Sequence, residues 1–331
     1  MMITRIAFAG VLALSLLATP VTVDAQQTRS VRTIAFFGPP PEVGGLVQAF
    51  QQGLRDLGYV EGQNIRIAYR YTDVAVQGHA DLFPRFATEL VRLKPDVIVV
   101  SIIEAALAVR NATSTIPIVM VNVQDPVAAG LVSSLARPGG NVTGLSRQSR
   151  DLIGKRLQLL REALPDPVPV GVLADATTPL NSMMVADTKE AARTLGVQIK
   201  IVDAGVPTDF EGAFSTLHTE RVGAVLVFAS PAFYLNRKEI AGLTLRHRLP
   251  AIFENREFVE AGGLLSYSVN SVANYRRAAL FVDKVLKGAK PADLPVEQPT
   301  KFEFVINLKT ARTLGLTIPP SLLLRADQII E

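Results

Sequence analysis

The amino-acid sequence predicts an α/β fold of two similar lobes, each built on a mainly parallel sheet. Short runs that are apolar on both faces, such as 97–100, alternate with segments whose apolar residues recur at helical spacing, such as 46–57. Such runs are typical of parallel strands covered by helices on both sides. The same order of elements recurs in the second half of the chain, and 331 residues exceed what one hydrophobic core usually organises.

The first half of the chain alternates strands with helices. Strands are expected at 31–37, 65–71, 97–100 and 117–123, and helices at 46–57, 80–93 and 104–113. The first helix ends at Gly58, a residue type common directly after a helix. The strand 117–123 runs into Asp125-Pro126, where proline disfavours helix at the preceding residue, so a carboxylate is expected at that strand end. A short apolar helix at 127–135 and an extended run at 141–145 follow.

The second half repeats this order. Strands are expected at 168–174, 197–202, 223–229 and 249–252, and helices at 183–195, 210–219 and 239–247. Gly196 stands before its strand as Gly58 stands before its own, and Pro250 opens a strand as Pro117 does. The ordered recurrence favours two lobes of one plan over a chance register between unrelated strand and helix units.

Past Ile252 the pattern of elements is less regular. The expected elements there are a strand at 264–268, a long helix at 273–286, an exposed proline-rich connection at 288–299, a strand at 302–306 and a helix at 308–314. Three extended pieces, 141–145, 264–268 and 302–306, are candidates for passing between the lobes and forming a hinge. The expected first lobe comprises 26–143 with about 269–300, and the second comprises 144–268 with about 307–331.

Residues 1–25 read as a signal peptide that directs export. Arg5 supplies a basic start, 6–18 an apolar core, and Val23-Asp24-Ala25 a small-residue cleavage site before Gln26. No later segment approaches the roughly 20 apolar residues that a membrane span needs. The sequence therefore predicts a free periplasmic protein, with an uncleaved membrane anchor as the alternative.

Composition and motifs exclude several function classes. The chain has no cysteine, and its formal charge of +4 comes from scattered basic residues, so neither thiol chemistry nor a nucleic-acid partner is expected. The three histidines lie beside charged or polar helix positions without metal-ligand spacing, and no phosphate-loop or nucleophile motif occurs. We therefore predict no catalytic residue, no metal site and no cofactor.

The candidate site consists of the loops at the strand ends, where ligands bind in open α/β sheets. Serine hydroxyls and helix N-termini could receive a carboxylate, acidic side chains an ammonium group, and aromatic rings an apolar side chain. These features together describe an amino acid. For each residue the alternative is structural, because serines and acids also cap helices and aromatic rings also fill cores. The predicted ligand-binding residues are Pro40, Ser101, Glu104, Asp125, Asp175, Ser230, Pro231, Phe253, Glu254 and Tyr267.

Five long segments resemble a known family. They read LRDLGYVEGQNIRIAYR, LVRLKPDVIVV, TIPIVMVNVQDPVAAGLVSSLARPGGNVTGLS, RHRLPAIFENREFVEAGGLLSY and KGAKPADLPVEQPTKFEFVINLKTARTLGLTIPPSLLLRAD. In this order they are similar to the ABC transporter substrate-binding proteins of the type I periplasmic-binding fold, which include tryptophan- and tyrosine-binding members. The resemblance implies two Rossmann-like lobes, three crossovers, a ligand closed between the lobes, and a permease and an ATPase as partners. Ser101-Ile102-Ile103 stands where many relatives carry a Gly-Thr or Ser-Thr pair with small residues, which implies a narrower or more apolar pocket.

The sequence therefore favours an exported, monomeric binding protein that captures a small organic solute, with an amino acid as first candidate. We expect Asp125→Ala to weaken binding. A subunit that senses the ligand for a membrane receptor would carry the same features. An exported enzyme using the same cleft is disfavoured by the missing catalytic constellation, and a repressor would need a DNA-binding helix pair where the signal peptide stands.

Overall fold

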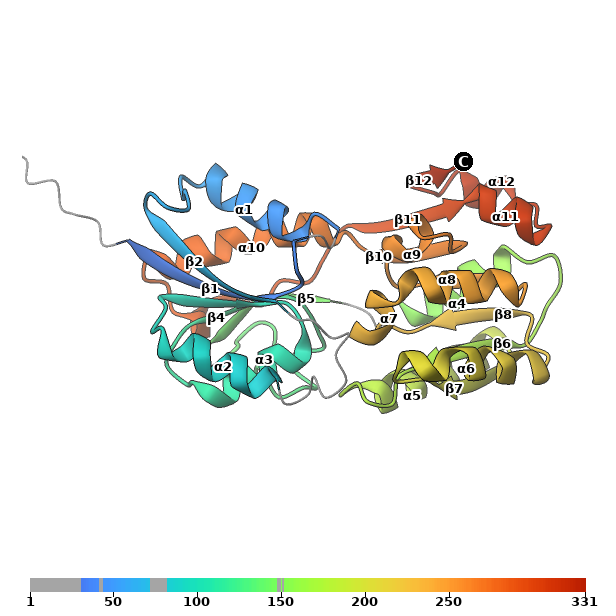
Figure 1. Ribbon diagram of the computed structural model, residues 1–331, viewed down its shortest axis with the longest axis horizontal. Coiled ribbons are helices and arrows are strands. Elements are labelled where there is room, and N and C mark those ends of the chain that lie inside the picture. The colour runs from blue at the N-terminus through green and yellow to red at the C-terminus, as the bar shows by residue number, and fades with distance from the viewer. Residues whose placement is uncertain (1–30, 42–43, 72–81, 148–149, 151) are drawn as a thin grey trace, which may run out of the picture. The chain divides into compact units, whose positions relative to one another are not determined.

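The computed structural model describes residues 31–41, 44–71, 82–147, 150 and 152–331. The predicted signal peptide, 1–25, lies outside the described residues. Within the described part, strands and helices alternate nearly as the sequence predicts, and the strands form two separate sheets (Figure 1). The predicted α/β fold with two mainly parallel sheets is therefore confirmed.

The first sheet contains five parallel strands in the order β2-β1-β3-β4-β5. Its elements are β1 (Arg32–Gly38), α1 (Leu46–Asp56), β2 (Ile65–Tyr71), α2 (Leu82–Arg92), β3 (Val97–Val100), α3 (Ile103–Ala112), β4 (Ile118–Gln124) and β5 (Val142–Arg147). Alternate side chains of β1 enter different cores, because Ile34 and Phe36 join one cluster while Ala35 and Phe37 join another. Both faces of this sheet are therefore buried under helices, as a parallel sheet requires.

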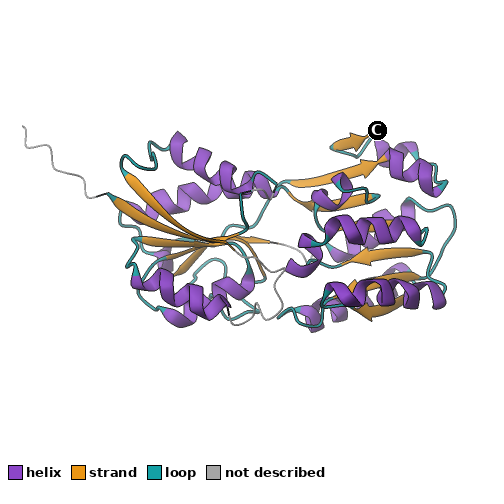
Figure 2. Cartoon of the chain, in the orientation of Figure 1, coloured by secondary structure: helices purple, strands orange, loops and turns teal. Residues whose placement is uncertain are grey.

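The second sheet contains seven strands in the order β12-β11-β10-β9-β8-β6-β7, antiparallel only between β10 and β11. Its strands are β6 (Val170–Ala174), β7 (Ile199–Asp203), β8 (Ala224–Val227), β9 (Ala251–Phe253), β10 (Leu265–Val269), β11 (Phe302–Asn307) and β12 (Gln328–Ile330). Its helices (purple in Figure 2) are α4 (Ile153–Glu162), α5 (Asn181–Leu195), α6 (Pro207–Thr219), α7 (Pro231–Leu235), α8 (Arg237–Arg246), α9 (Arg256–Glu260), α11 (Leu308–Leu314) and α12 (Pro320–Leu323). Its core also splits into one cluster on each face.

The chain passes between the two sheets three times. It leaves the first sheet after β5, returns after β10 to form α10 (Ser271–Leu286), and leaves again before β11. Helix α10 packs on α1 so closely that a Cβ at Gly53 would lie 2.3 Å from the carbonyl oxygen of Arg276. A glycine is needed there because only the absence of a side chain permits that approach.

The prediction for 127–135, the segment before β5, is wrong, and the prediction for 288–299 holds only in part. Residues 127–135 form turns instead of a helix, because Gly130 takes a left-handed conformation (φ 71°) and ends the first turn. The connection 288–299 is not simply exposed. Val296 is buried, and the backbone of Glu297 hydrogen bonds with Gly144 and Ser146 on β5, so this segment is tied to the edge of the first sheet.

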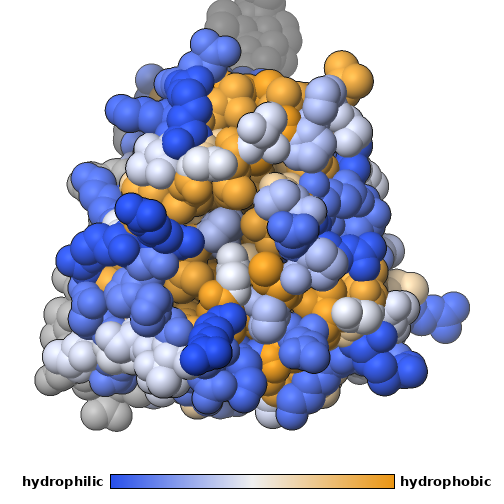
Figure 3. All heavy atoms as spheres, turned by 90° about the vertical axis from the view of Figure 1, so that its right-hand side faces the viewer, coloured by the Kyte–Doolittle hydropathy of each residue, from blue (hydrophilic) through white to orange (hydrophobic). Residues whose placement is uncertain are grey.

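Among the helices of the described residues, none is long and apolar enough to span a bilayer. The large apolar side chains recorded as exposed there are scattered along the chain, and hydrophilic side chains divide the apolar areas on the face in Figure 3. Single exposed apolar residues are ordinary on folded proteins.

Candidate functional site

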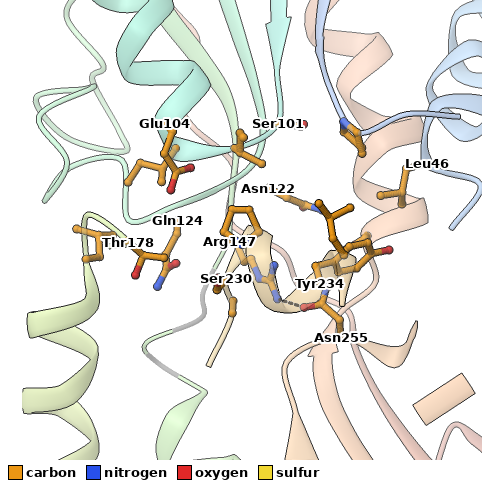
Figure 4. Close-up of a pocket in the computed structure, with 18 of the residues that line it drawn as sticks. Leu46, Ser101, Glu104, Asn122, Gln124, Arg147, Thr178, Ser230, Tyr234 and Asn255 are labelled. Carbon is orange, nitrogen blue, oxygen red and sulfur yellow. Dashed lines mark hydrogen bonds between the residues drawn. The ribbon is translucent and has the colours of Figure 1, made fainter. Parts of the chain in front are cut away.

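The candidate site is a pocket lined by residues that follow strands of both sheets (Figure 4). From the first sheet and α10 come Pro39, Pro40, Leu46, Ser101, Ile102, Ile103, Glu104, Asn122, Gln124, Arg147, Ser271 and Tyr275. From the second sheet come Thr178, Pro179, Leu180, Ala229, Ser230, Pro231, Tyr234, Leu235 and Asn255. Because the lining lies at the carboxyl ends of parallel strands, it is where open α/β sheets bind ligands.

Half of the residues predicted from the sequence line this pocket. They are Pro40, Ser101, Glu104, Ser230 and Pro231. The other five, Asp125, Asp175, Phe253, Glu254 and Tyr267, lie outside the lining.

Asp125 borders a second cavity instead. One carboxylate oxygen accepts a hydrogen bond from the backbone N–H of Ala128, and the other pairs with Arg150 at 2.5 Å. The same guanidinium also pairs with Asp187 on α5. Asp125 therefore contributes to an ion-paired link between the end of β4 and the second sheet, and the expectation that it contacts the ligand has no support in this geometry.

Asp175 lies outside the pocket lining, and both oxygens of its carboxylate accept hydrogen bonds from the protein. One oxygen accepts from the backbone N–H and the hydroxyl of Thr177, and the other accepts from the hydroxyl of Ser230 at 2.5 Å. Ser230 also accepts from the N–H of Phe233 and so caps α7. Asp175 therefore fixes the ends of β6 and β8 against each other instead of offering an oxygen to a ligand.

The two aromatic residues predicted to contact the ligand, Phe253 and Tyr267, have no support in this geometry. Phe253 is fully buried and stacks on Phe258, with ring centroids 4.7 Å apart. Tyr267 packs on the second-sheet core and stacks on Phe302. The rings that do border the pocket are Tyr234 and Tyr275, which the sequence analysis did not select.

Glu104 is the acidic side chain of the pocket lining. It lies in the first turn of α3, and its oxygen Oε2 is buried without a hydrogen-bond partner in the described structure. Burial raises the pKa of Glu104 above its usual value, the charge of Asp175 raises it further, and only the backbone N–H of Glu104 lowers it. The pocket therefore holds a carboxylate whose charge the surrounding protein does not neutralise.

Arg147, at the end of β5, is the basic side chain of the lining, and the sequence analysis missed it. Its Nη2 donates to the carbonyl oxygen of Glu254 and to Oδ1 of Asn255, and lies 3.5 Å from the Glu254 carboxylate. Among the described residues, neither Nε nor Nη1 of Arg147 donates a hydrogen bond, so both remain available to a ligand.

Glu254 lies outside the pocket lining and serves as a counter-ion, so this geometry gives no support to the predicted ligand contact. Its buried carboxylate lies between Arg147 and the fully buried Arg156, 3.4 Å from Nη1 of the latter. Burial lowers the pKa of Arg156 to about 10, opposed by the charge of Glu254. Arg156 also donates from Nε to the carbonyl oxygen of Tyr267, which connects this cluster to β10.

Asn122 occupies a strained position beside the pocket. Its backbone is left-handed (φ 58°) within an irregularity of the β4–β5 pairing, and its Oδ1 accepts from Nδ2 of Asn274 at 2.6 Å. Bulges and positive-φ residues commonly turn a side chain toward a functional site. No local sequence signal marks this residue, because an asparagine within an apolar strand reads only as an interruption.

The lining is mainly apolar, with a few polar groups, as is usual for small-molecule binding sites. Apolar side chains such as Ile102, Leu180 and Leu235 surround the few polar groups, and no histidine lies among the lining residues. Within the described residues, no group of three potential metal ligands comes together.

Two sheets joined by three connections, with a pocket at their strand ends, define the type I periplasmic-binding fold. The fold alone does not specify a function, because a LacI-family transcriptional regulator from Mycobacterium smegmatis shares it at a TM-score of 0.57 and 14% identity. The chain belongs to the ABC transporter substrate binding protein family, whose model matches residues 40–330.

Individual relatives within this class are moderately similar. A tyrosine-binding protein from Clostridioides difficile (strain R20291) is 28% identical over 281 residues, covering 83% of this chain and 78% of the relative. An ABC domain from Streptococcus pneumonia, solved in complex with L-Trp, is 27% identical with a TM-score of 0.83, covering 91% of this chain and 100% of that one. A conserved domain protein from Vibrio cholerae is also 27% identical with a TM-score of 0.84, covering 90% and 99%.

Proposed function

We propose that this solute-binding protein is exported to the periplasm, binds a small organic solute in the pocket between its two sheets and delivers it to an ABC permease and its ATPase. An amino acid, aromatic or aliphatic, is the first candidate ligand. The observation that carries the proposal is that one mainly apolar lining contains both an unneutralised carboxylate, Glu104, and a guanidinium with free donors, Arg147. Relatives that bind tyrosine and tryptophan support the same ligand class.

The site residues are assigned from two sources. The sequence nominated Pro40, Ser101, Glu104, Ser230 and Pro231, and the structure adds Asn122, Gln124, Arg147, Tyr234, Asn255 and Tyr275. These residues derive from both sheets, so a ligand that touches all of them favours the conformation in which the sheets are close. Binding free energy then shifts an equilibrium between open and closed forms, which is the signal that a permease can read.

We further propose that the closing units are 26–143 with about 269–300, and 144–268 with about 307–331, in a monomer. The three connections between the sheets allow such a hinge, since each is a short segment at the end of a strand.

The test is a ligand screen followed by calorimetry. Purified protein is screened by thermal shift against amino acids, small aromatic acids and sugars, and molecules that copurify are identified by mass spectrometry. Arg147→Gln should weaken binding of the solute found by about tenfold or more, because a charged hydrogen bond is lost. Arg85→Gln, on the exposed surface of α2, is the matched control and should bind normally.

Two results would contradict the proposal. The first is that no small solute binds or copurifies. The second is that Arg147→Gln binds with unchanged affinity, which would place the ligand elsewhere. Uptake of the labelled solute by cells with and without the protein distinguishes transport from sensing, because a sensor's loss leaves uptake intact.

A further inference from the structure

We propose that Glu104 is a specificity-determining residue that selects ligands carrying a cationic nitrogen, such as a primary ammonium group. The inference rests on the proposed solute-binding function and adds a chemical requirement to it. It assigns the cation-binding role to a residue other than Asp125, Asp175 and Glu254, the carboxylates that the sequence suggested for that role.

The placement of Glu104 follows from its local structure. Strand β3 ends at Val100, Ile102 takes an extended conformation without a side-chain cap, and α3 begins at Ile103. Glu104 is therefore the second residue of the helix, and its side chain emerges where the strand ends open into the pocket. Figure 4 shows its carboxylate on the pocket side of α3, facing the region bordered by Gln124 and Thr178.

The carboxylate of Glu104 accepts fewer hydrogen bonds from the protein than its two oxygens can accept. The backbone N–H of Glu104 supports it, but Oε2 is buried and has no hydrogen-bond partner. No Lys, Arg or His of the described chain forms a salt bridge with Glu104, whereas carboxylates such as those of Asp125 and Glu254 do form ion pairs. Burying an ionised carboxylate without a partner is unfavourable, so such a group is retained where something outside the chain completes it.

The neighbouring charge strengthens this argument. Asp175 lies near enough to raise the pKa of Glu104, and each of its own oxygens already accepts hydrogen bonds, from Thr177 and from Ser230. The two carboxylates repel each other, and of the two only Glu104 lines the pocket and has an oxygen without a hydrogen-bond partner in the described structure. A cationic group at Glu104 would relieve the repulsion and supply the missing hydrogen bonds, whereas an anionic group would increase it.

The basic side chain of the lining lies apart from this end. Arg147 donates hydrogen bonds to the carbonyl oxygen of Glu254 and to Oδ1 of Asn255, and it forms no salt bridge with Glu104. A neutral hydroxylated ligand could also donate to Glu104, but it would leave the buried charge uncompensated. A cationic nitrogen satisfies both the open hydrogen-bond capacity and the charge.

The test compares matched probes that differ only in their charged groups. One set is L-tyrosine, tyramine and 3-(4-hydroxyphenyl)propanoate, a second is L-leucine, isopentylamine and 4-methylpentanoate, and ribose is the neutral probe. Each is titrated by calorimetry into the wild type, Glu104→Gln and, as a surface control, Glu211→Gln on α6. A mass-spectrometric identification of any copurified solute accompanies the titrations.

The expected result is selective. In the wild type the probes with an amino group bind at least tenfold more tightly than the corresponding acid without it. Glu104→Gln lowers their affinity about tenfold or more, consistent with loss of a charged hydrogen bond, while the affinity of the acid without the amino group stays unchanged. Glu211→Gln behaves as the wild type.

Other outcomes overturn the inference. Equal losses for probes with and without the amino group would mean that Glu104 has only a structural role. Copurification of a neutral solute or of an anion without a cationic nitrogen, or binding of ribose or of either acid probe as tight as that of the amino probes, would refute the requirement while leaving the solute-binding function intact. If no solute of any class binds, the proposed function fails and the inference falls with it.

Discussion

Replacing Glu104 by glutamine should stabilise the protein while weakening its function. The variant keeps the size of the side chain but removes the charge that the structure leaves buried and incompletely paired. Functional sites commonly reduce stability in this way, because groups prepared for a ligand are unsatisfied before it arrives. The ligand-free protein is therefore the form to measure.

The sign of the effect follows from the direction of the pKa shift. Burial raises the pKa of Glu104 above its usual 4.5, so the folded state holds this proton more tightly than the unfolded state does. The fold is therefore penalised when Glu104 is ionised, and the penalty disappears as the pH falls below 4.5. An unsatisfied buried group costs about 1 to 3 kcal/mol, which corresponds to roughly 2 to 6 °C in Tm for a protein of this size class.

The assay is thermal unfolding of ligand-free protein between pH 4 and pH 8. Glu104→Gln should unfold at a higher temperature than the wild type at pH 7 to 8, and the two curves should converge at the acid end. The surface variant Glu211→Gln should follow the wild type throughout. A Glu104→Gln variant that is less stable than the wild type at pH 7, or a Tm difference independent of pH, would show that the carboxylate is satisfied in solution and refute the reasoning.

Three further predictions concern backbone packing and the support of the pocket. Gly53→Ala should destabilise the protein by about 2 to 4 kcal/mol, because its Cβ would lie 2.3 Å from a carbonyl oxygen of α10, whereas Gly212→Ala, with open space around it in α6, should be neutral or stabilise by up to about 1 kcal/mol. Gly144→Ala should be at least as harmful, since its Cβ would lie 2.2 Å from a β4 carbonyl at φ 125°, while Gly140→Ala should be tolerated. Ser230→Ala should cost about 1 to 3 kcal/mol by leaving a buried carboxylate oxygen without its donor. Urea unfolding measures all five variants.

Each of these predictions has a clear contrary result. Equal stabilities of Gly53→Ala and Gly212→Ala would show that α10 can move away from α1 at little cost. A Gly144→Ala variant as stable as Gly140→Ala would mean that the β4–β5 pairing is not as close as its register indicates. An unchanged midpoint for Ser230→Ala would show that water replaces the lost hydroxyl.

Local patterns in the sequence were sufficient to predict the fold. The run at β3, apolar on both faces, and the glycines that follow α1 and α5 depend only on neighbouring residues, so they are readable without the structure. Glu104 was also found this way, because a residue in the first turn after a strand end lies near the ligand edge of the sheet whatever the rest of the chain does.

Only the tertiary structure decided which polar groups the pocket offers. Asp175 and Glu104 both follow strands. A serine 55 residues away donates a hydrogen bond to the carboxylate of Asp175, whereas no group of the described chain donates one to Oε2 of Glu104. Arg147 reaches the pocket because its partners, 107 and 108 residues further along, hold it there. A carboxylate's availability depends on donors brought from distant segments, and such pairings leave no periodic trace in the sequence.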